Sequence, residues 1–492
     1  YPVKKESIKK EIFKKKNGLK IWQRLQGKVY GEFIANAKIF NGLKKFIIHS
    51  NLKNYKIFII SHKTHFGHYD EKKISLRKSA LDFLDSKKIV NSNITGIKKK
   101  NIFFFSTRRK KITHIKKLKL NFFIDDLSEV LCDKNFPTKT NKILFSNTKD
   151  DKKNIIKINN WFKIDEIING YWSTQHLKKL SSILLKKKDI LDLNQIHNGI
   201  NSKVYKLKFK KNKNLILKIY PFEDNFVSRR MRVENDSLKY LKKNNFPVPG
   251  IYKSFFEFNC SFYEFQSGKK NLKATKQLID QCYDFLKKLF LLSRKTKINL
   301  FPNAKEACFN PNEICEQIEK KFNNFLKINN KALNNFLLLE FQDLFTKFSK
   351  IVKSKLGKKF KNNISNSNRI LSPSDFGLHN TLSEKNKLYF LDFEYFGWDD
   401  PIKLICDFFW HPGNNMSKKL KDRFLYKVTN FFSKKYKNFK NKLYVLLPLY
   451  GLRWCLIILN CFVKKNYKNK ILETQQLKKA KKILNQVSHY GY

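Results

Sequence analysis

The stretch from residue 370 to 413 contains most of the polar groups that could perform chemistry. It reads ILSPSDFGLHNTLSEKNKLYFLDFEYFGWDDPIKLICDFFWHPG and places Asp375, Asn380 and Asp392 within or beside apolar runs. Polar groups in such surroundings are costly to bury unless they are paired or bind a ligand. Carboxylate and amide oxygens suit Mg²⁺, so Asn380 and Asp392 are candidate metal ligands. Asp375 is a candidate base for an attacking hydroxyl, and the combination predicts phosphoryl transfer.

Four regions of different texture must position these residues. Residues 1–150 alternate apolar runs with helical patterns, which predicts a parallel sheet with helices on its faces. Residues 151–185 are expected to form a linker and a leading helix, and residues 186–268 a small antiparallel sheet with one helix. Residues 269–492 are predicted to be helical, apart from a catalytic loop at 371–394. The apolar runs expected as strands in the first region are 56–61, 101–106, 120–125 and 141–146.

The motif-dense stretch resembles the aminoglycoside phosphotransferase and choline kinase family, which has a bilobal protein-kinase-like fold. The family pattern is HxDxxxxN, followed by an apolar strand that ends in Asp. Pro373 replaces the first His, which normally supports the loop, and the other positions match at Asp375, Asn380 and Asp392. The resemblance implies transfer of the γ-phosphoryl group of ATP or GTP, with Mg²⁺, to a hydroxyl of a sugar, amino alcohol or aminoglycoside-like molecule.

Two further features follow from this resemblance. The segment WDDPIKLICDF at 398–408 is similar to the family's GDPxxDL region, in which Asp407 would be a structural anchor. No APE-like motif or long activation segment follows it, which favours a small-molecule kinase over a protein kinase.

The same resemblance assigns a nucleotide-binding role to residues upstream. Lys218 lies inside the apolar run 215–220, where a charge needs a partner or a phosphate. The family pattern pairs it with the α- and β-phosphates and with Glu234 on a helix. The segment 197–205 would replace the glycine-rich phosphate loop, and 263–268 would be the hinge whose backbone contacts adenine. The further candidate nucleotide-binding residues are Gly199, Asn201, Ser202 and Glu264.

Residues 1–150 resemble, less closely, the haloacid-dehalogenase-like (HAD) phosphotransferase fold, a Rossmann-like parallel sheet. Ser61 ends one predicted strand, Lys110 or Lys111 lies in the expected interval, and Asp125 and Asp126 end another strand. In the HAD pattern, such a serine would hold a phosphate and such an acidic pair would bind Mg²⁺.

The HAD nucleophile motif, DxDx[TV] after an apolar strand, is absent from the sequence. The resemblance places it just before Tyr1. The domain is therefore expected to be active only in a longer chain, or to be a catalytically inactive scaffold. An unrelated α/β domain with an ordinary acidic pair is the alternative.

The net charge of +63 invites a polyanion-binding interpretation. Most of the 103 basic residues are lysines, however, whereas base and phosphate recognition favours arginine. Lys, Asn, Ile and Phe have codons rich in A and T, so a biased genome explains the composition better, and nucleic acid is a less favoured partner. A polyanion binder and a non-catalytic HAD/kinase-like scaffold are the two alternatives to a small-molecule kinase.

The remaining composition favours a cytoplasmic protein. Eight cysteines include no CxxC pair, which disfavours a structural zinc site and fits a reducing compartment. The apolar segment 444–463 contains Pro448 and Arg453, so we interpret it as a buried helix rather than a membrane span. The sequence carries no signal for an oligomeric state.

Overall fold

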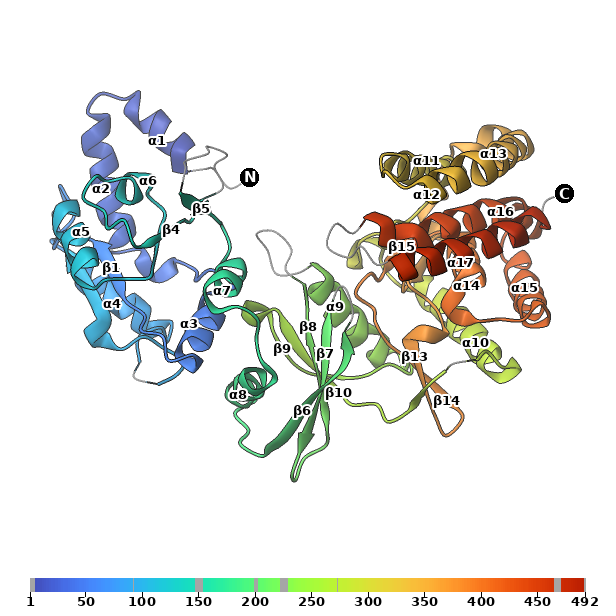
Figure 1. The fold of residues 1–492 in the computed structure, drawn as a ribbon, viewed down its shortest axis with the longest axis horizontal. Helices are drawn as coiled ribbons and strands as arrows, with labels where there is room; N and C mark the ends of the chain where they lie inside the picture. The colour runs from blue at the N-terminus through green and yellow to red at the C-terminus, as the bar shows by residue number, and fades with distance from the viewer. Residues whose placement is uncertain are drawn as a thin grey trace. The chain divides into compact units, whose positions relative to one another are not determined.

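The computed structural model describes residues 5–91, 93–146, 154–198, 202–221, 229–271, 273–463 and 470–490. The chain divides into two compact units. The first unit comprises Tyr1–Met231 and Tyr252–Tyr263, and the second comprises Arg232–Ile251 and Glu264–Tyr492. Helices and strands carry the labels of Figure 1.

The N-terminal part of the first unit is an α/β region. Its elements are α1 (Lys5–Phe13), α2 (Gly18–Tyr30), α3 (Leu43–Leu52), β1 (Ile59–His62), α4 (Leu76–Ser86), β2 (Ile102–Phe105), α5 (Arg108–Lys117), β3 (Phe122–Asp125), α6 (Ser128–Leu131), β4 (Asn141–Leu144) and β5 (Ile155–Lys157). Each of the four predicted apolar runs overlaps a strand. The strands pair in parallel, as expected for short apolar runs joined through helices, but they form two ladders, β1–β2 and β3–β4–β5. A HAD-like architecture stays a prediction.

Helix α3 contributes to two hydrophobic cores of the first unit. Phe46 and Ile47 pack into the core of the α/β region, with Ile143 and Ile164. Ile48 packs into a second core, together with residues of α8 (Thr174–Leu185) and of the strands that follow, which include the buried Leu177, Leu180, Leu207 and Phe262. Helix α7 (Trp161–Asn169) packs into the first core through Ile164. The helices after β5 are therefore packed parts of the first unit.

The second core lies against a five-stranded sheet. The strands are β6 (Ile190–Asn198), β7 (Lys203–Phe209), β8 (Leu215–Ile219), β9 (Ile251–Phe255) and β10 (Cys260–Glu264), in the order β6-β7-β8-β10-β9. Figure 1 shows α8 beside β6. The ladders β6–β7 and β7–β8 are antiparallel, as the alternating pattern predicted, and Val204 lies opposite Lys218. Helix α9 (Arg229–Lys243) follows β8 in the chain.

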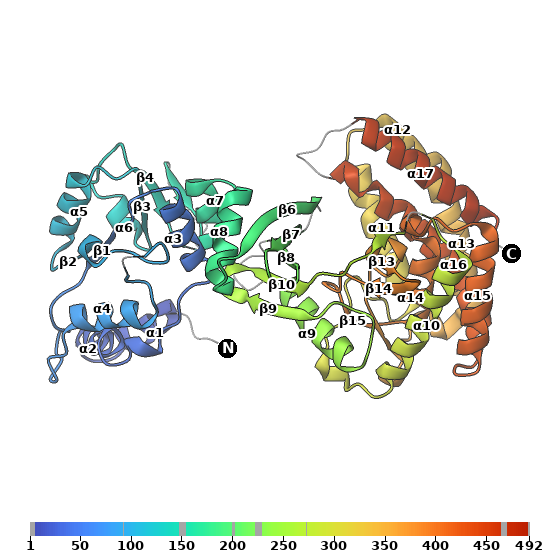
Figure 2. The ribbon, with the colours of Figure 1, turned by 90° about the horizontal axis from the view of Figure 1, so that it is seen from below.

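The second unit is mainly helical, as expected. Its helices after α9 are α10 (Lys276–Ser293), α11 (Pro311–Leu326), α12 (Lys331–Asn335), α13 (Gln342–Leu356), α14 (Pro401–Trp410), α15 (Lys418–Ser433), α16 (Phe439–Ile458) and α17 (Lys470–Ser488). Its short strands are β11 (Lys269–Lys270), β12 (Ile370–Ser372), β13 (Thr381–Glu384), β14 (Lys387–Phe390) and β15 (Gly397–Asp399). A π-helical segment, Phe336–Phe341, joins α12 to α13. Figure 2 shows α16 beside α17.

Within the described residues, one helical segment, Phe439–Val463, is long and apolar enough to span a membrane. Its mean hydropathy reaches 1.8, but 67% of that apolar window is buried inside the protein. Arg453 lies in this segment and donates to Asp407, Glu306 and Gln317 at 3.0, 2.7 and 2.9 Å. A buried charge with three partners is typical of a packed interior, in agreement with the interpretation as a buried helix.

Candidate active site

A tight turn after β12 presents Asp375. β12 pairs antiparallel with β15, and the backbone N–H of Leu371 donates to Ser293 Oγ of α10 at 2.8 Å. Ser372 Oγ accepts from the N–H of Ser374, which has a left-handed φ of 67°. The N–H of Asp375 then donates to the Pro373 carbonyl at 2.9 Å. Pro373 thus takes part in a turn that is anchored to a buried strand and a helix.

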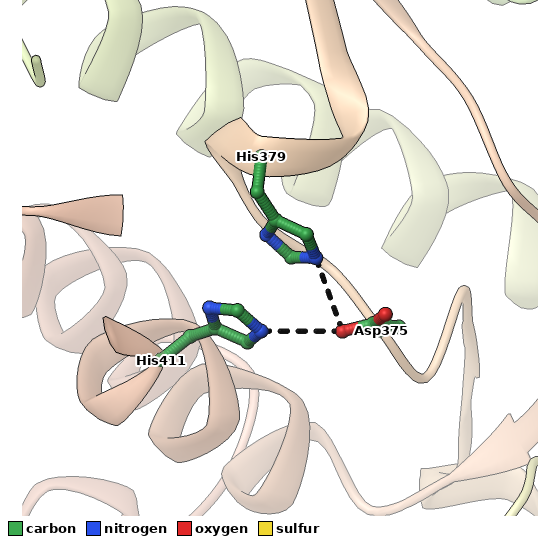
Figure 3. A group of neighbouring side chains, drawn as sticks. All are labelled: Asp375, His379 and His411. Atoms are coloured by element: carbon green, nitrogen blue, oxygen red, sulfur yellow. Dashed lines mark ion pairs between the residues drawn. The ribbon is translucent and has the colours of Figure 1, made fainter. Parts of the chain in front are cut away.

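Three side chains surround the Asp375 carboxylate, and two of them, His379 and His411, are drawn in Figure 3. Nε2 of His379 and Nε2 of His411 each lie 3.3 Å from Oδ1. The amide nitrogen of Asn380 lies 3.3 Å from Oδ2 and donates to the Asp375 carbonyl at 3.0 Å. The two imidazole rings are stacked, with centroids 4.0 Å apart and planes 6° from parallel. The carboxylate is therefore held on both of its oxygens.

This environment keeps Asp375 ionised. Burial opposes its ionisation, but the hydrogen bonds and charges of His379 and His411 outweigh burial and hold the pKa of Asp375 well below its usual range. Burial lowers the pKa of His411, against the opposite effect of Asp375. The His411 Nδ1 atom accepts from the Gly413 N–H at 2.9 Å, so its proton lies on Nε2, facing Asp375. An ionised carboxylate can orient a hydroxyl and accept its proton.

The β13–β14 hairpin brings the two predicted metal ligands to the same end. Thr381 lies opposite Phe390, and beyond this pair the Asn380 carbonyl accepts from the Leu391 N–H at 2.9 Å. Asp392 follows directly, with a left-handed φ of 65°. This conformation is uncommon except for Gly, Asn and Asp, and it turns the chain at the end of the ladder. The structure brings Asp375 and Asn380 together.

The Asp392 carboxylate belongs to a cluster with Glu234 of α9 and Glu394. One carboxylate oxygen from each lies within 4.8 Å of the others. Glu234 and Glu394 are buried, and Glu234 Oε1 accepts from the Phe393 N–H at 3.3 Å. All three donors are oxygens, which fits a hard cation such as Mg²⁺. The prediction placed Asp392 and Asn380 together as ligands; the cluster adds two carboxylates to Asp392.

The acidic residues after this cluster are structural. Asp400 caps α14 by accepting from the Ile402 N–H at 2.7 Å. Lys403 Nζ joins Asp399 and Asp407 at 2.7 and 2.8 Å, and Arg453 and the Trp454 indole also donate to Asp407. Burial raises the pKa of Asp399 to about 6, although Lys403 opposes this effect. Asp407 has the anchoring role that the sequence predicted.

The predicted nucleotide-binding residues are only partly described. Lys218 lies in β8, is 7% exposed, and has its Nζ 5.2 Å from the centre of the Tyr220 ring. Ser202 is buried directly before β7, whereas Gly199 and Asn201 lie outside the described residues. The Glu264 side chain accepts from the Gly250 N–H at 2.9 Å and pairs with Lys242, so it supports the backbone there. The pairing of Lys218 with Glu234 stays a prediction.

The HAD-like residues differ in one respect from the prediction. Asp125 is buried at the end of β3, where it pairs with Lys111 and accepts from the Leu127 N–H at 3.0 Å. Of the two candidate lysines, Lys110 is exposed on α5, whereas Lys111 lies on the buried face of that helix. Asp126 is exposed, and Ser61 is half-buried in β1. The roles of these residues stay predictions.

Sequence reasoning missed His379, His411 and Glu394. His379 lies in a 3-10 turn, Leu378–Asn380, and His411 follows α14 at the start of another, Pro412–Asn414. The available signal was compositional, since the chain has only 10 histidines and two of them lie in the motif-dense stretch. The signal for Glu394 was its position in the sequence, because it is the second acidic residue of the LDFE segment at 391–394.

No protein-family model and no curated protein matches the chain. Solved structures that are similar include spectinomycin phosphotransferase in complex with ADP and spectinomycin, at 14% identity and a TM-score of 0.46 over 64% of this chain and 99% of that one. A choline kinase from Streptococcus pneumoniae has 16% identity and a TM-score of 0.42, over 63% and 98%. A choline/ethanolamine kinase family protein from Mesorhizobium loti has 14% identity and a TM-score of 0.45, over 63% and 95%.

By name, these neighbours are a phosphotransferase, a choline kinase and a choline/ethanolamine kinase family protein. At these sequence identities and TM-scores, the similarity concerns only the path of the backbone. The chemistry of this chain has to come from its own side chains.

Proposed function

We propose that this protein is a phosphotransferase that moves the γ-phosphoryl group of ATP or GTP to a hydroxyl group of a small molecule. The observation that carries the proposal is the Asp375 carboxylate, kept ionised and held on both oxygens beside Asn380. Such a group is suited to orient an attacking hydroxyl and to accept its proton.

The other roles follow from the chemistry of the residues. Asp392 and Asn380 would hold Mg²⁺, with Glu394 and Glu234 close enough to Asp392 to add carboxylate oxygens. The ion would neutralise charge on the phosphate oxygens when bound. Lys218, a buried cation in a strand, would contact the phosphates, with Ser202, Gly199 and Asn201 near the phosphate loop and Glu264 near the hinge.

The acceptor is expected to be a sugar, an amino alcohol or an aminoglycoside-like molecule. The test is a screen of such compounds with γ-labelled ATP and GTP, in which transfer of label to an acceptor supports the proposal. Asp375→Asn is the matched control, because it keeps the size of the side chain and removes the charge. Label transfer that is equal in wild type and Asp375→Asn would contradict the proposed role, and absence of transfer with any acceptor would contradict the proposed function.

A further inference from the structure

The two oxygens of Asp375 have different surroundings. Oδ1 faces two imidazole nitrogens at 3.3 Å, from His379 and His411, whereas Oδ2 lies beside the single amide of Asn380. The Asp375 side chain is 40% exposed, against 13% for His411. Because Oδ1 is occupied by two imidazoles that lie deeper in the protein, Oδ2 is the oxygen available to an acceptor hydroxyl.

The stacking of the rings decides between two interpretations of this group. Two histidines and one carboxylate can hold a metal ion, and the nitrogen and oxygen atoms lie within 4.8 Å of one another. An imidazole binds a metal with the lone pair in its ring plane. His379 and His411 are stacked with planes 6° from parallel, so their lone pairs cannot meet at one ion. The two N···O distances of 3.3 Å fit polar contacts of the imidazole N–H groups with a shared carboxylate oxygen, which tolerate misalignment better than metal coordination does.

The position of the ring protons supports this interpretation. His411 Nδ1 accepts from the Gly413 N–H, which leaves the proton on Nε2. Neither ring nitrogen of His379 has a hydrogen-bond partner of full geometry within the described part of the chain, but Nε2 lies 3.3 Å from Asp375 Oδ1, so the carboxylate stabilises a proton on that nitrogen. Both imidazoles thus favour a proton on the nitrogen that faces Asp375.

The two turns that carry these histidines are fastened together. Asn414 accepts from the Leu378 N–H at 2.6 Å and donates to the Phe408 carbonyl at 2.6 Å. A Cβ at Gly377 would lie 2.7 Å from both Asn414 Oδ1 and His379 Nδ1, so only glycine fits that close approach. The Trp454 ring packs edge-on against His411, with centroids 4.5 Å apart. The stacked pair therefore has a fixed place relative to the turn that presents Asp375.

We propose that His379 and His411 are positioning residues for the base Asp375, and that they replace the loop support which the family pattern assigns to a His where this chain has Pro373. They hold Oδ1, so that Oδ2 points to the acceptor hydroxyl. This inference rests on the proposed function, since it concerns the base of that reaction.

The kinetic test compares His411→Ala, His379→Ala and His411→Gln with wild type, using the acceptor found in the screen. A loosened carboxylate should lower kcat by roughly 10- to 100-fold. The KM for nucleotide should stay within about twofold, because the contacts of the two histidines are with Asp375 and not with the predicted nucleotide-binding residues. His411→Gln supplies an N–H near Nε2 and should recover part of the loss. Added imidazole should rescue His411→Ala, in which it can occupy the vacated space.

His489→Ala is the matched control, because that histidine is exposed on the same unit. Wild-type kcat in both alanine variants, or losses that imidazole and glutamine do not recover, would overturn the inference while leaving the proposed function intact.

A second measurement does not depend on turnover. In histidine ¹H–¹⁵N spectra, the wild type should show Nε2–H signals for His379 and His411 that shift in Asp375→Asn. Unchanged signals would overturn the inference even in an active enzyme. A wild type that transfers no phosphoryl group contradicts the proposed function. The positioning role is then also contradicted, because it concerns the base of that reaction, even if the spectra show the contact between the histidines and Asp375.

Discussion

Glu234 Oε1 accepts a hydrogen bond from the backbone N–H of Phe393 at 3.3 Å, although the two residues are 159 positions apart. Through this hydrogen bond, a carboxylate of α9 contacts the backbone of the residue that follows Asp392. A helix that precedes most of the second unit thereby fixes the turn that carries a predicted metal ligand. The end of the β13–β14 ladder and the hydrogen bond from the Phe396 N–H to the Phe393 carbonyl also contribute to this turn.

Replacement of Glu234 should therefore loosen the Asp392 turn. Glu234→Ala leaves the buried Phe393 N–H unsatisfied, which should lower the free energy of unfolding by about 1–3 kcal/mol. Glu234→Gln keeps an acceptor oxygen and should lose less stability than Glu234→Ala. Urea unfolding measures both. Equal stability of the two variants and wild type would show that this hydrogen bond does not hold the turn.

Asp375→Asn should lower kcat by about 10²–10⁴-fold, the usual range for loss of a general base. Nucleotide affinity should change little, because the carboxylate contacts two imidazoles and an amide rather than a phosphate site. Single-turnover kinetics and equilibrium binding of a labelled nucleotide separate the two effects. A variant that loses nucleotide affinity but keeps its turnover rate at saturation would reassign Asp375 to binding.

Asp392→Ala should abolish nucleotide-dependent turnover and leave the fold intact. Asp392 ends a ladder on the partly exposed side of the carboxylate cluster, so its removal costs little packing while it takes a carboxylate from the proposed ion. Circular dichroism checks the fold, and turnover against Mg²⁺ concentration checks the site. Full activity at ordinary Mg²⁺ levels would remove Asp392 from the mechanism.

Mg²⁺ with ATP should stabilise the wild type. A ligand at about 100 times its dissociation constant adds about 2.7 kcal/mol to the free energy of unfolding. The rise in melting temperature should depend on Mg²⁺ and should be smaller in Asp392→Ala. A wild type whose melting temperature does not respond to either nucleotide would favour the non-catalytic scaffold over a kinase.

Lys403→Met should destabilise the second unit by about 3–5 kcal/mol, because it leaves buried carboxylates without their shared cation. Lys403 is 1% exposed and lies between Asp399 and Asp407. Lys442→Met is the matched control: its Nζ lies 3.8 Å from Asp400 at a more exposed position, and its loss should cost less than about 1 kcal/mol. Chemical denaturation compares the two, and similar losses would contradict the structural role of the buried lysine.

The sequence could predict what depends on local pattern. Apolar runs such as 101–106 and 120–125 became strands because three or four consecutive apolar residues are best buried in a parallel ladder. The apolar run that contains Lys218 became a strand of an antiparallel sheet. The Asn380 amide contacts Asp375 because only five positions separate the two residues in the chain, and a tight turn between them keeps their side chains close.

The sequence by itself thus determined the order of the elements. It also determined the chemical types of the candidate site residues, which are the carboxylates of Asp375 and Asp392 and the amide of Asn380. Only the tertiary structure decided which distant side chains meet them: His411 on Asp375, Glu234 on the Phe393 backbone, and Lys111 rather than Lys110 on Asp125. The physical reason is that hydrogen-bond and ion-pair contacts need the donor and acceptor within a few ångströms. Only the packing of whole helices against strands brings residues so far apart in the chain within that distance.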